Sequence, residues 1–192
     1  MKKLYFLVLA LAIGQISFSQ TFMHGVGVNT LIAKGGLDGY NQTTEIYGSL
    51  MYSPRINFME SDNTSLSFGI PMSLGFSGNY SSQGTGSGSL SVMFDAPFII
   101  NYNYGAGSTK ETDSRFGLYG GIGYGYHTVS YTATDQYETY STSGSGWGPT
   151  GNIGFRFGVG AGTHNIEIRL SYLKLMNDYH TSIYGIGGIF NF

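Results

Sequence analysis

Apolar residues alternate with small or polar residues along much of this chain. In the clearest stretch, residues 65–77, every even position from Leu66 to Phe76 is apolar, whereas the odd positions are Ser, Gly or Pro. Successive side chains of a β-strand point to opposite faces, so this pattern predicts a strand with one oily face and one small, polar face.

The same alternation recurs along the rest of the chain and predicts eight strands. We place them at residues 22–32, 44–59, 64–78, 89–104, 115–133, 147–159, 164–176 and 181–192. They cover well over half of residues 20–192, whereas about 20–25% strand is usual, so the fold class is all-β, a barrel or a sandwich. Pro54, Pro71 and Pro97 fall inside predicted strands. Since proline cannot donate a ladder hydrogen bond, we expect bulges or strand ends near them.

The first 19 residues have the pattern of a secretory signal peptide. A basic start, Met1-Lys2-Lys3, is followed by an almost purely apolar stretch from Leu4 to Ile13 and by small residues before Gln20. A membrane anchor is the alternative, but ten residues of helix span about 15 Å of a hydrocarbon core of roughly 30 Å. We therefore predict a signal peptide at 1–19 and one barrel domain at 20–192. The later apolar runs are so short that this domain could enter a membrane as a closed barrel but not as a helix.

Composition removes several classes of function. The chain has 31 Gly, 16 Tyr, 13 Phe and no Cys, and 10% of its residues are charged. Without cysteine there is no disulfide, zinc-thiolate site or thiol nucleophile. There are nine Lys plus Arg against eleven Asp plus Glu, and loss of Lys2 and Lys3 with the leader makes the balance more acidic. A nucleic-acid partner is therefore not expected.

Alternation alone does not say whether the oily face points into the barrel or out of it. The interior of an eight-stranded barrel is just wide enough for side chains to fill. Rows of Leu, Phe and Ile would crowd that interior, whereas Ser, Gly, Asn and a few charges would fit it. We therefore expect the oily face to meet lipid, with a secreted soluble barrel or sandwich as the alternative. Aromatic residues near the strand ends support two membrane interfaces: Phe58, Tyr102, Phe116 and Phe192 towards one rim, and Tyr47, Trp147, Tyr179 and Tyr184 towards the other.

The last strand carries a possible assembly signal. A terminal Phe192, an aromatic Phe190 two residues earlier and Gly187 five residues before the end resemble the signal that hands outer-membrane barrels to their insertion machinery. The match is partial, because Gly185 stands where that signal usually has a polar residue. With its leader and eight strands, the chain resembles the small eight-stranded outer-membrane β-barrel proteins, the group that includes the OmpA membrane domain and OmpX.

That resemblance implies an antiparallel up-and-down transmembrane barrel in the outer membrane, with both termini periplasmic and with the lipid bilayer and the insertion machinery as partners. Connection lengths favour the same orientation, because the connections after odd-numbered strands are together longer than those after even-numbered strands. Residues 105–114, after the fourth strand, are long for a periplasmic turn.

The alternation that turns Leu, Ile and Phe towards lipid turns five charged residues into the lumen. They are Arg55, Asp95, Arg156, Glu167 and Arg169. Isolated charges are costly in a narrow lumen, so we expect Glu167 and Asp95 to pair with some of the arginines and to plug the barrel. The alternative is that some of them lie near a rim and are solvated.

Catalytic, cofactor and metal sites are not predicted. His127, Ser130 and Asp135 contain the residue types of a catalytic triad, but the opposite parity of His127 and Ser130 puts them on different faces of a strand. No two of the histidines, His24, His127, His164 and His180, have the spacing of metal ligands. We predict a structural, adhesive or surface-interaction role, with a possible extracellular ligand or surface partner. A narrow channel for small solutes is the alternative, and an outer-membrane enzyme is the third possibility.

Overall fold

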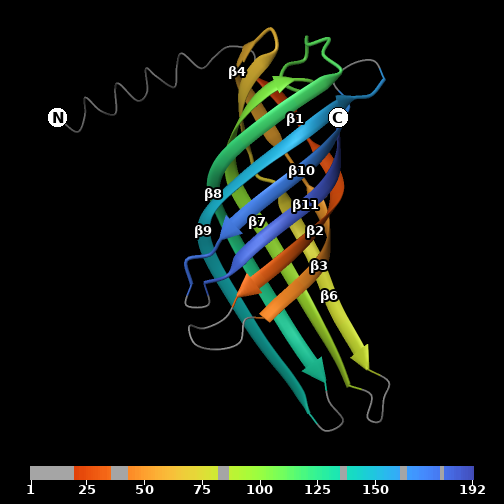
Figure 1. Cartoon of the computed structure of the whole chain (residues 1–192), viewed down its shortest axis with the longest axis vertical. Coiled ribbons are helices and arrows are strands. Elements are labelled where there is room, and N and C mark those ends of the chain that lie inside the picture. Colours follow the sequence, from red (N-terminus) through yellow and green to blue (C-terminus); the bar gives the residue numbers. More distant parts are fainter. Residues whose placement is uncertain (1–19, 36–42, 82–86, 135–137, 161–163, 178–179) are drawn as a thin grey trace, which may run out of the picture.

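The computed structural model describes residues 20–35, 43–81, 87–134, 138–160, 164–177 and 180–192, and most of them lie in one β-sheet (Figure 1). Within these ranges, no helix is long and apolar enough to cross a membrane. The predicted signal peptide at 1–19 lies outside the described residues.

The sheet consists of consecutive antiparallel strands. The described strands are β1 (Thr21–Met23), β2 (Gly25–Gly35), β3 (Thr43–Tyr52), β4 (Arg55–Ser61), β5 (Thr64–Gly69), β6 (Met72–Ser81), β7 (Ser87–Gly105), β8 (Phe116–Thr134), β9 (Thr139–Gly158), β10 (Asn165–Lys174) and β11 (Ser182–Asn191).

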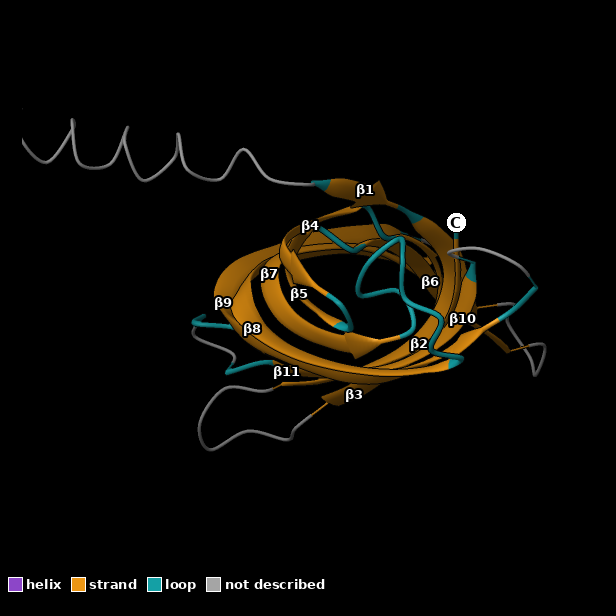
Figure 2. Ribbon diagram, turned by 90° about the horizontal axis from the view of Figure 1, so that it is seen from above, coloured by secondary structure: helices purple, strands orange, loops and turns teal. Residues whose placement is uncertain are grey.

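These segments make eight barrel strands, because β1/β2, β3/β4 and β5/β6 are halves of three interrupted strands. Each barrel strand pairs with its neighbours in the chain, and β11 pairs with β2 from Ser182 opposite Lys34 to Asn191 opposite Gly25. This last pairing closes the sheet into the ring that Figure 2 shows end-on. The prediction of a closed eight-stranded antiparallel barrel is confirmed.

Two of the three prolines interrupt their strands as predicted. Pro54 separates β3 from β4, and Pro71 separates β5 from β6. At Pro97 the prediction is wrong, because β7 continues through it, opposite Gly125 of β8. Along the other edge of β7, Ile99 pairs with Gly69 of β5 and Asp95 pairs with Ser73 of β6, and the residues between them have no ladder partner there among the described strands. Pro97 therefore faces the gap between β5 and β6, where no ladder donor is needed.

The predicted faces also agree with the structure. Outward positions carry exposed apolar side chains, such as Leu50 at 65% and Ile122 at 78% exposure, whereas inward positions such as Ser67 and Asn57 are buried. Tyr47 was assigned to an outer rim, and this is wrong, since its side chain points into the lumen and is 1% exposed. The inward residues of this strand have odd numbers, so the position of Tyr47 in the alternation already indicates the lumen.

The two ends of the barrel differ. The chain start at β1, the C-terminus and the β4–β5 turn lie at one end, which we call the terminal end (Figure 1). The opposite end, which we call the loop end, is where β2, β6, β8 and β10 end.

Candidate functional site

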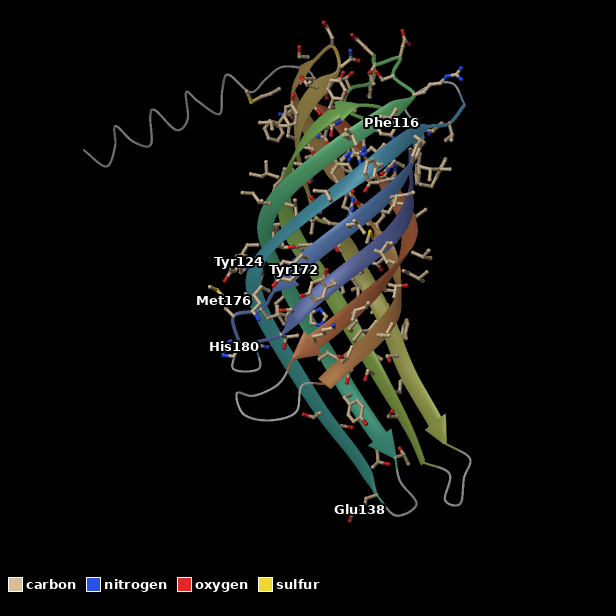
Figure 3. The ribbon with its side chains drawn as sticks, in the orientation of Figure 1. Phe116, Tyr124, Glu138, Tyr172, Met176 and His180 are labelled. Carbon is tan, nitrogen blue, oxygen red and sulfur yellow. The ribbon has the colours of Figure 1, made fainter. Side chains whose placement is uncertain are left out.

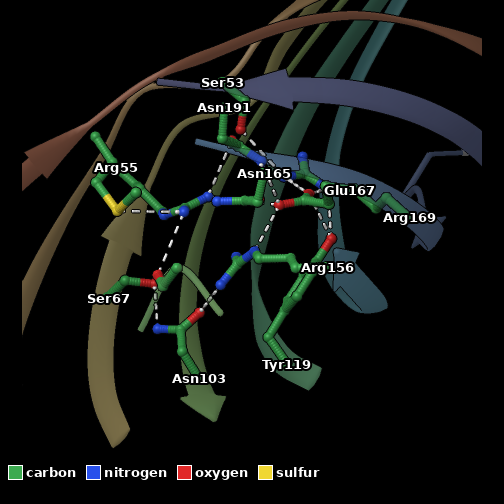
Figure 4. A network of polar contacts seen from close by, with 12 residues as sticks. Ser53, Arg55, Ser67, Asn103, Tyr119, Arg156, Asn165, Glu167, Arg169 and Asn191 are labelled. Carbon is green, nitrogen blue, oxygen red and sulfur yellow. Dashed lines mark hydrogen bonds and ion pairs between the residues drawn. The ribbon is translucent and has the colours of Figure 1, made fainter. Parts of the chain in front are cut away.

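Glu167 of β10 is the centre of a polar cluster that fills the lumen near the terminal end (Figure 4). Its side chain is 0% exposed. Glu167 Oε2 accepts a hydrogen bond from Arg156 Nε at 2.8 Å, and Oε1 accepts one from Arg169 Nη2 at 2.6 Å. Arg55 Nη1 lies 3.4 Å from Oε2. Three guanidinium groups thus surround one carboxylate, which leaves an excess of positive charge.

Tyr119 of β8 connects these groups. Its hydroxyl donates to Glu167 Oε1 at 2.6 Å and accepts from Arg169 Nε at 2.9 Å. The guanidinium carbon of Arg156 lies 4.1 Å from the centre of the Tyr119 ring, in cation–π contact. The sequence analysis did not single out Tyr119, although its inward parity could have identified it. We call Arg55, Tyr119, Arg156, Glu167 and Arg169 the charge cluster.

Neutral oxygens compensate the excess positive charge of the cluster. They are Asn103 Oδ1, 2.9 Å from Arg156 Nη1, Ser53 Oγ, 3.1 Å from Arg169 Nη2, and Asn191 Oδ1, 3.2 Å from Arg55 Nη1. Such hydrogen bonds stabilise buried charges, although Arg55 Nε is buried without a hydrogen-bond partner among the described residues.

The connection between β7 and β8 is residues 106–115, and its first part, residues 106–109, folds into the terminal end of the lumen. Asn57 Nδ2 donates to the carbonyl oxygens of Gly107 at 3.3 Å and Ser108 at 2.7 Å, and Arg55 Nη2 donates to Gly107 at 3.4 Å. Gly107 has φ 74°, and a Cβ there would lie 2.8 Å from Asn165 Nδ2. Figure 2 shows loop segments crossing this opening. The long connection that the sequence analysis placed at residues 105–114 therefore caps the charge cluster with its first residues.

Asp95 does not join the charge cluster, and the prediction that it pairs with an arginine is wrong. Its Oδ1 lies 3.6 Å from His127 Nδ1, the residue opposite it on β8. Asp95 and Arg169 line the same small cavity, yet the ion pair of Asp95 is with His127. Parity gave the inward face of Asp95 correctly, but it does not give which lumen residue lies beside Asp95 in a barrel of tilted strands.

A small cavity lined by both polar and apolar side chains lies between the charge cluster and the loop end. Its volume is about 20 Å³, and its lining includes Asn29, Ser73, Asp95, Asn152 and Arg169. Among the described residues, Asp95 Oδ1 and both polar side-chain atoms of Asn152 are buried without a hydrogen bond. A space of this size is large enough for about one water molecule beside these polar atoms.

Apolar side chains fill the lumen nearer the loop end. We call this group the apolar plug: Leu31, Tyr47, Met93, Leu173, Leu175 and Ile183. The Tyr47 hydroxyl donates to the carboxylate of Glu45. In the described part of the chain, side chains thus fill the lumen at two levels, one charged and one apolar.

The structure does not assemble a catalytic triad from the residues considered for it. His127 is buried in the lumen, Ser130 is exposed on the opposite face, and Asp135 lies outside the described residues. His24 and His164 pack against the rim aromatics Phe192 and Phe190. Among the described residues, no group of three or more His, Cys, Asp or Glu could hold a metal ion.

The residues of the possible assembly signal lie on β11 and just after it. Gly187 points inward, where a Cβ would lie 2.8 Å from Asn29 Cβ. Phe190 and Phe192 are exposed on the outer face, with ring centres 6.0 Å apart. Their role in assembly stays a prediction.

Four strands extend beyond the rest of the barrel at the loop end (Figures 1 and 3). Residues 77–81 of β6 and 139–146 of β9 have ladder partners on one side, in β7 and β8. With residues 87–91 and 130–134 between them, they form what we call the projecting sheet. The sixth strand was predicted to begin at residue 147. This is wrong, since the corresponding strand β9 begins at Thr139. Residues 139–146 have no oily face, so alternation could not identify them as a strand.

No family model matches the sequence, and no curated protein matches it. Its fold is similar to that of solved structures. Ail, the attachment invasion locus protein of Yersinia pestis, crystallised with the heparin analogue sucrose octasulfate, is 13% identical with a TM-score of 0.51, over 89% of this chain and 99% of Ail. Neisserial surface protein A is 12% identical with a TM-score of 0.48, over 90% of this chain and 97% of that one. The chain has the fold of the small eight-stranded outer-membrane β-barrels.

Proposed function

We propose that this chain is a non-catalytic barrel of the outer membrane that binds an external partner through its projecting sheet. Both termini then lie in the periplasm, and the projecting sheet extends from the cell surface. The single observation that carries the proposal is the free edge of β9. From Thr139 to Gly146 this strand pairs with β8 alone within the described residues.

A free edge presents unpaired N–H and C=O groups to another strand. The described side chains from Ser141 to Ser145 are exposed on both faces of β9, so a partner strand could reach this edge. Residues 76–92 and 128–146 contain no Lys or Arg. Ail was crystallised with a sulfated ligand, but a sulfated glycan does not suit this cation-free sheet. An uncharged, extended peptide segment suits it better.

The test uses the purified barrel in nanodiscs and a labelled peptide copy of residues 139–146, with binding measured by fluorescence anisotropy. We expect saturable binding to the parent and weaker binding to the Ser141→Lys, Ser143→Lys double variant, because lysines blunt an edge strand. Ser130→Lys is the matched control, since Ser130 lies opposite Ser143 but on the interior strand β8. Equal binding by the parent and the double variant would contradict the proposal.

A narrow channel is the second candidate, and the two filled levels of the lumen argue against it. We expect little or no stable conductance when the refolded parent is inserted in a planar bilayer. A large, steady parental pore would favour the channel. Heat-modifiable gel migration of the same sample shows whether the barrel has folded.

Assembly by the outer-membrane insertion machinery is part of the proposal. Replacing Phe190 and Phe192 with Ser should leave secretion intact, because the leader acts separately, but should reduce the amount of folded barrel. The measurement is the heat-modifiable fraction in isolated membranes. Equal folded fractions in variant and parent would remove Phe190 and Phe192 from the assembly signal.

A further inference from the structure

Two lysines stand on the outer face of the barrel at the loop end. The described strands contain five cationic residues. Lys34 of β2 and Lys174 of β10 are at outward-facing positions, whereas the other three point into the lumen: Arg55, Arg156 and Arg169. Both are paired in register with Ser182 of β11, which lies between them. Their backbones are thus two strand spacings apart, about 10 Å.

Among the described residues, no acid on this face neutralises the positive charge of the lysine pair. The outward positions of β2, β3, β10 and β11 carry no carboxylate. Lys174 Nζ donates to the carbonyl oxygen of His180 at 2.6 Å and to Ser182 Oγ at 3.2 Å, which positions its ammonium beside Ser182. Among the described residues, the Lys34 ammonium makes no ion pair. An anion small enough to contact both ammonium groups can therefore bind between Lys34 and Lys174.

Aromatic rings give the depth of this lysine pair in the membrane. The rings of Tyr172 and Tyr184 lie 5.2 Å apart, one outward position below Lys174 and Ser182 on their strands. Figure 3 shows Tyr172 and His180 on this flank near the loop end. Tyrosine is enriched where the headgroups meet the acyl chains. The two ammonium groups therefore lie at headgroup level.

A groove on the same flank lies below the lysine pair, among the apolar outward side chains. It has a volume of about 590 Å³ and is walled by Val28, Leu50, Phe76 and Ile186. Glycines form its floor, since a Cβ at Gly48 or Gly188 would meet nothing within 4 Å. Thr30, which also lines the groove, is four residues from Lys34 on β2, about 13 Å along the strand. The lysine pair and the groove are thus parts of one continuous surface.

We propose that this surface binds one phosphate-bearing lipid of the outer leaflet. The phosphate lies between Lys34 and Lys174, and an acyl chain lies in the groove over Gly48 and Gly188. Phosphate suits the lysine pair because it is a compact anion with several acceptor oxygens. A methylene chain suits the groove because its walls are apolar and it faces the hydrocarbon core. The leaflet assignment rests on the proposed orientation of the barrel.

Native mass spectrometry of the full barrel tests this proposal. Dioleoyl phosphatidic acid should be retained more strongly than dioleoyl phosphatidylcholine. The Lys34→Gln, Lys174→Gln double variant should lose about thirtyfold in affinity for the acid, the effect of two lysines at a membrane surface. Lys110→Gln is the matched control, because Lys110 is an exposed cation at the terminal end, and it should behave as the parent. Equal retention by the double variant and the parent would overturn the proposal.

A second pair of variants tests the groove separately. Gly48→Leu with Gly188→Leu fills it without a clash at Cβ, so it should weaken binding of dioleoyl but not of dihexanoyl phosphatidic acid. If inorganic phosphate competes as well as the lipid, and the filled groove changes nothing, the site is a phosphate site without a lipid and the proposal fails.

Failure of lipid binding can be distinguished from failure of the proposed function, which is peptide binding at the β9 edge. Peptide binding at the β9 edge should be unchanged in both lysine variants. Because the chain has no cysteine, Thr139→Cys provides a unique label position. Labelling of intact cells by an impermeant maleimide places the loop end outside. Absence of labelling would overturn the outer-leaflet assignment.

Discussion

The charge cluster and the apolar plug fill the same lumen in different ways. Around Glu167, each contact depends on the direction of a hydrogen bond, and removing one partner leaves buried charges without compensation. Around Leu173, the contacts depend on volume and shape, so a side chain of similar size can replace another. The comparison teaches that one barrel can be filled by groups that tolerate very different amounts of change.

The largest effect is expected from Glu167→Gln. It leaves three buried guanidinium groups without their carboxylate, and removal of one partner from a buried ion pair costs about 3–5 kcal/mol. Guanidinium unfolding of the barrel in lipid vesicles measures this loss. Glu111→Gln, at an exposed position of the β7–β8 connection, is the control and should be neutral. Comparable stability of Glu167→Gln and Glu111→Gln would mean that the charge cluster does not stabilise the barrel.

Leu173→Ala should have the next largest effect. Leu173 is 4% exposed within the apolar plug, and a buried Leu→Ala change costs about 3 kcal/mol through lost burial and the remaining cavity. The same unfolding experiment applies. Leu170→Ala, on the lipid face of the same strand, should cost clearly less, and the reverse order would contradict the assignment of faces.

Arg156→Lys should be costly even though it keeps the charge. Lysine cannot reproduce the bonds of Arg156 to both Glu167 and Asn103 or its contact with the Tyr119 ring, and a hydrogen bond to a charged group contributes about 1.5–3 kcal/mol. Arg115→Lys at an exposed position provides the comparison. A neutral Arg156→Lys would show that charge alone holds the cluster.

Leu31→Met should have the smallest effect. A change that conserves volume in an apolar core usually costs less than about 1.5 kcal/mol. Unfolding curves for Leu31→Met and Arg156→Lys, measured together, compare conservative changes in the two regions. A larger loss for Leu31→Met would reverse the comparison from which these predictions start.

The sequence identified the strands of the membrane-spanning region because lipid imposes a regular pattern on them. Leu66 to Phe76 alternate because one face must be oily, and the same rule placed Arg55, Arg156 and Glu167 in the lumen. It also led us to expect an arginine partner for Asp95, which is wrong, because the partner depends on strand tilt and pairing register, and the parity of one strand contains neither.

Features outside the hydrocarbon layer were less predictable. Residues 139–146 form a strand with no oily face, and the side chains from Ser141 to Ser145 are exposed on both faces. The fold of residues 106–109 into the lumen depends on contacts of Gly107 and Ser108 with Asn57, which is distant in the chain. Apolar and polar residues alternate in a strand when its two faces lie in different surroundings. These segments do not have one face in lipid and the other in the lumen, so their sequences show no alternation.

The charge cluster also has a consequence for how long the barrel lasts. Arg55 and Asn191, which it joins, are 136 residues apart in the sequence, so their contact requires the β2–β11 seam to be closed first. Interactions that form after the folding transition state slow unfolding without accelerating folding. We expect the cluster to act as a late latch, whose removal shortens the lifetime of the closed barrel while leaving its rate of closure nearly unchanged.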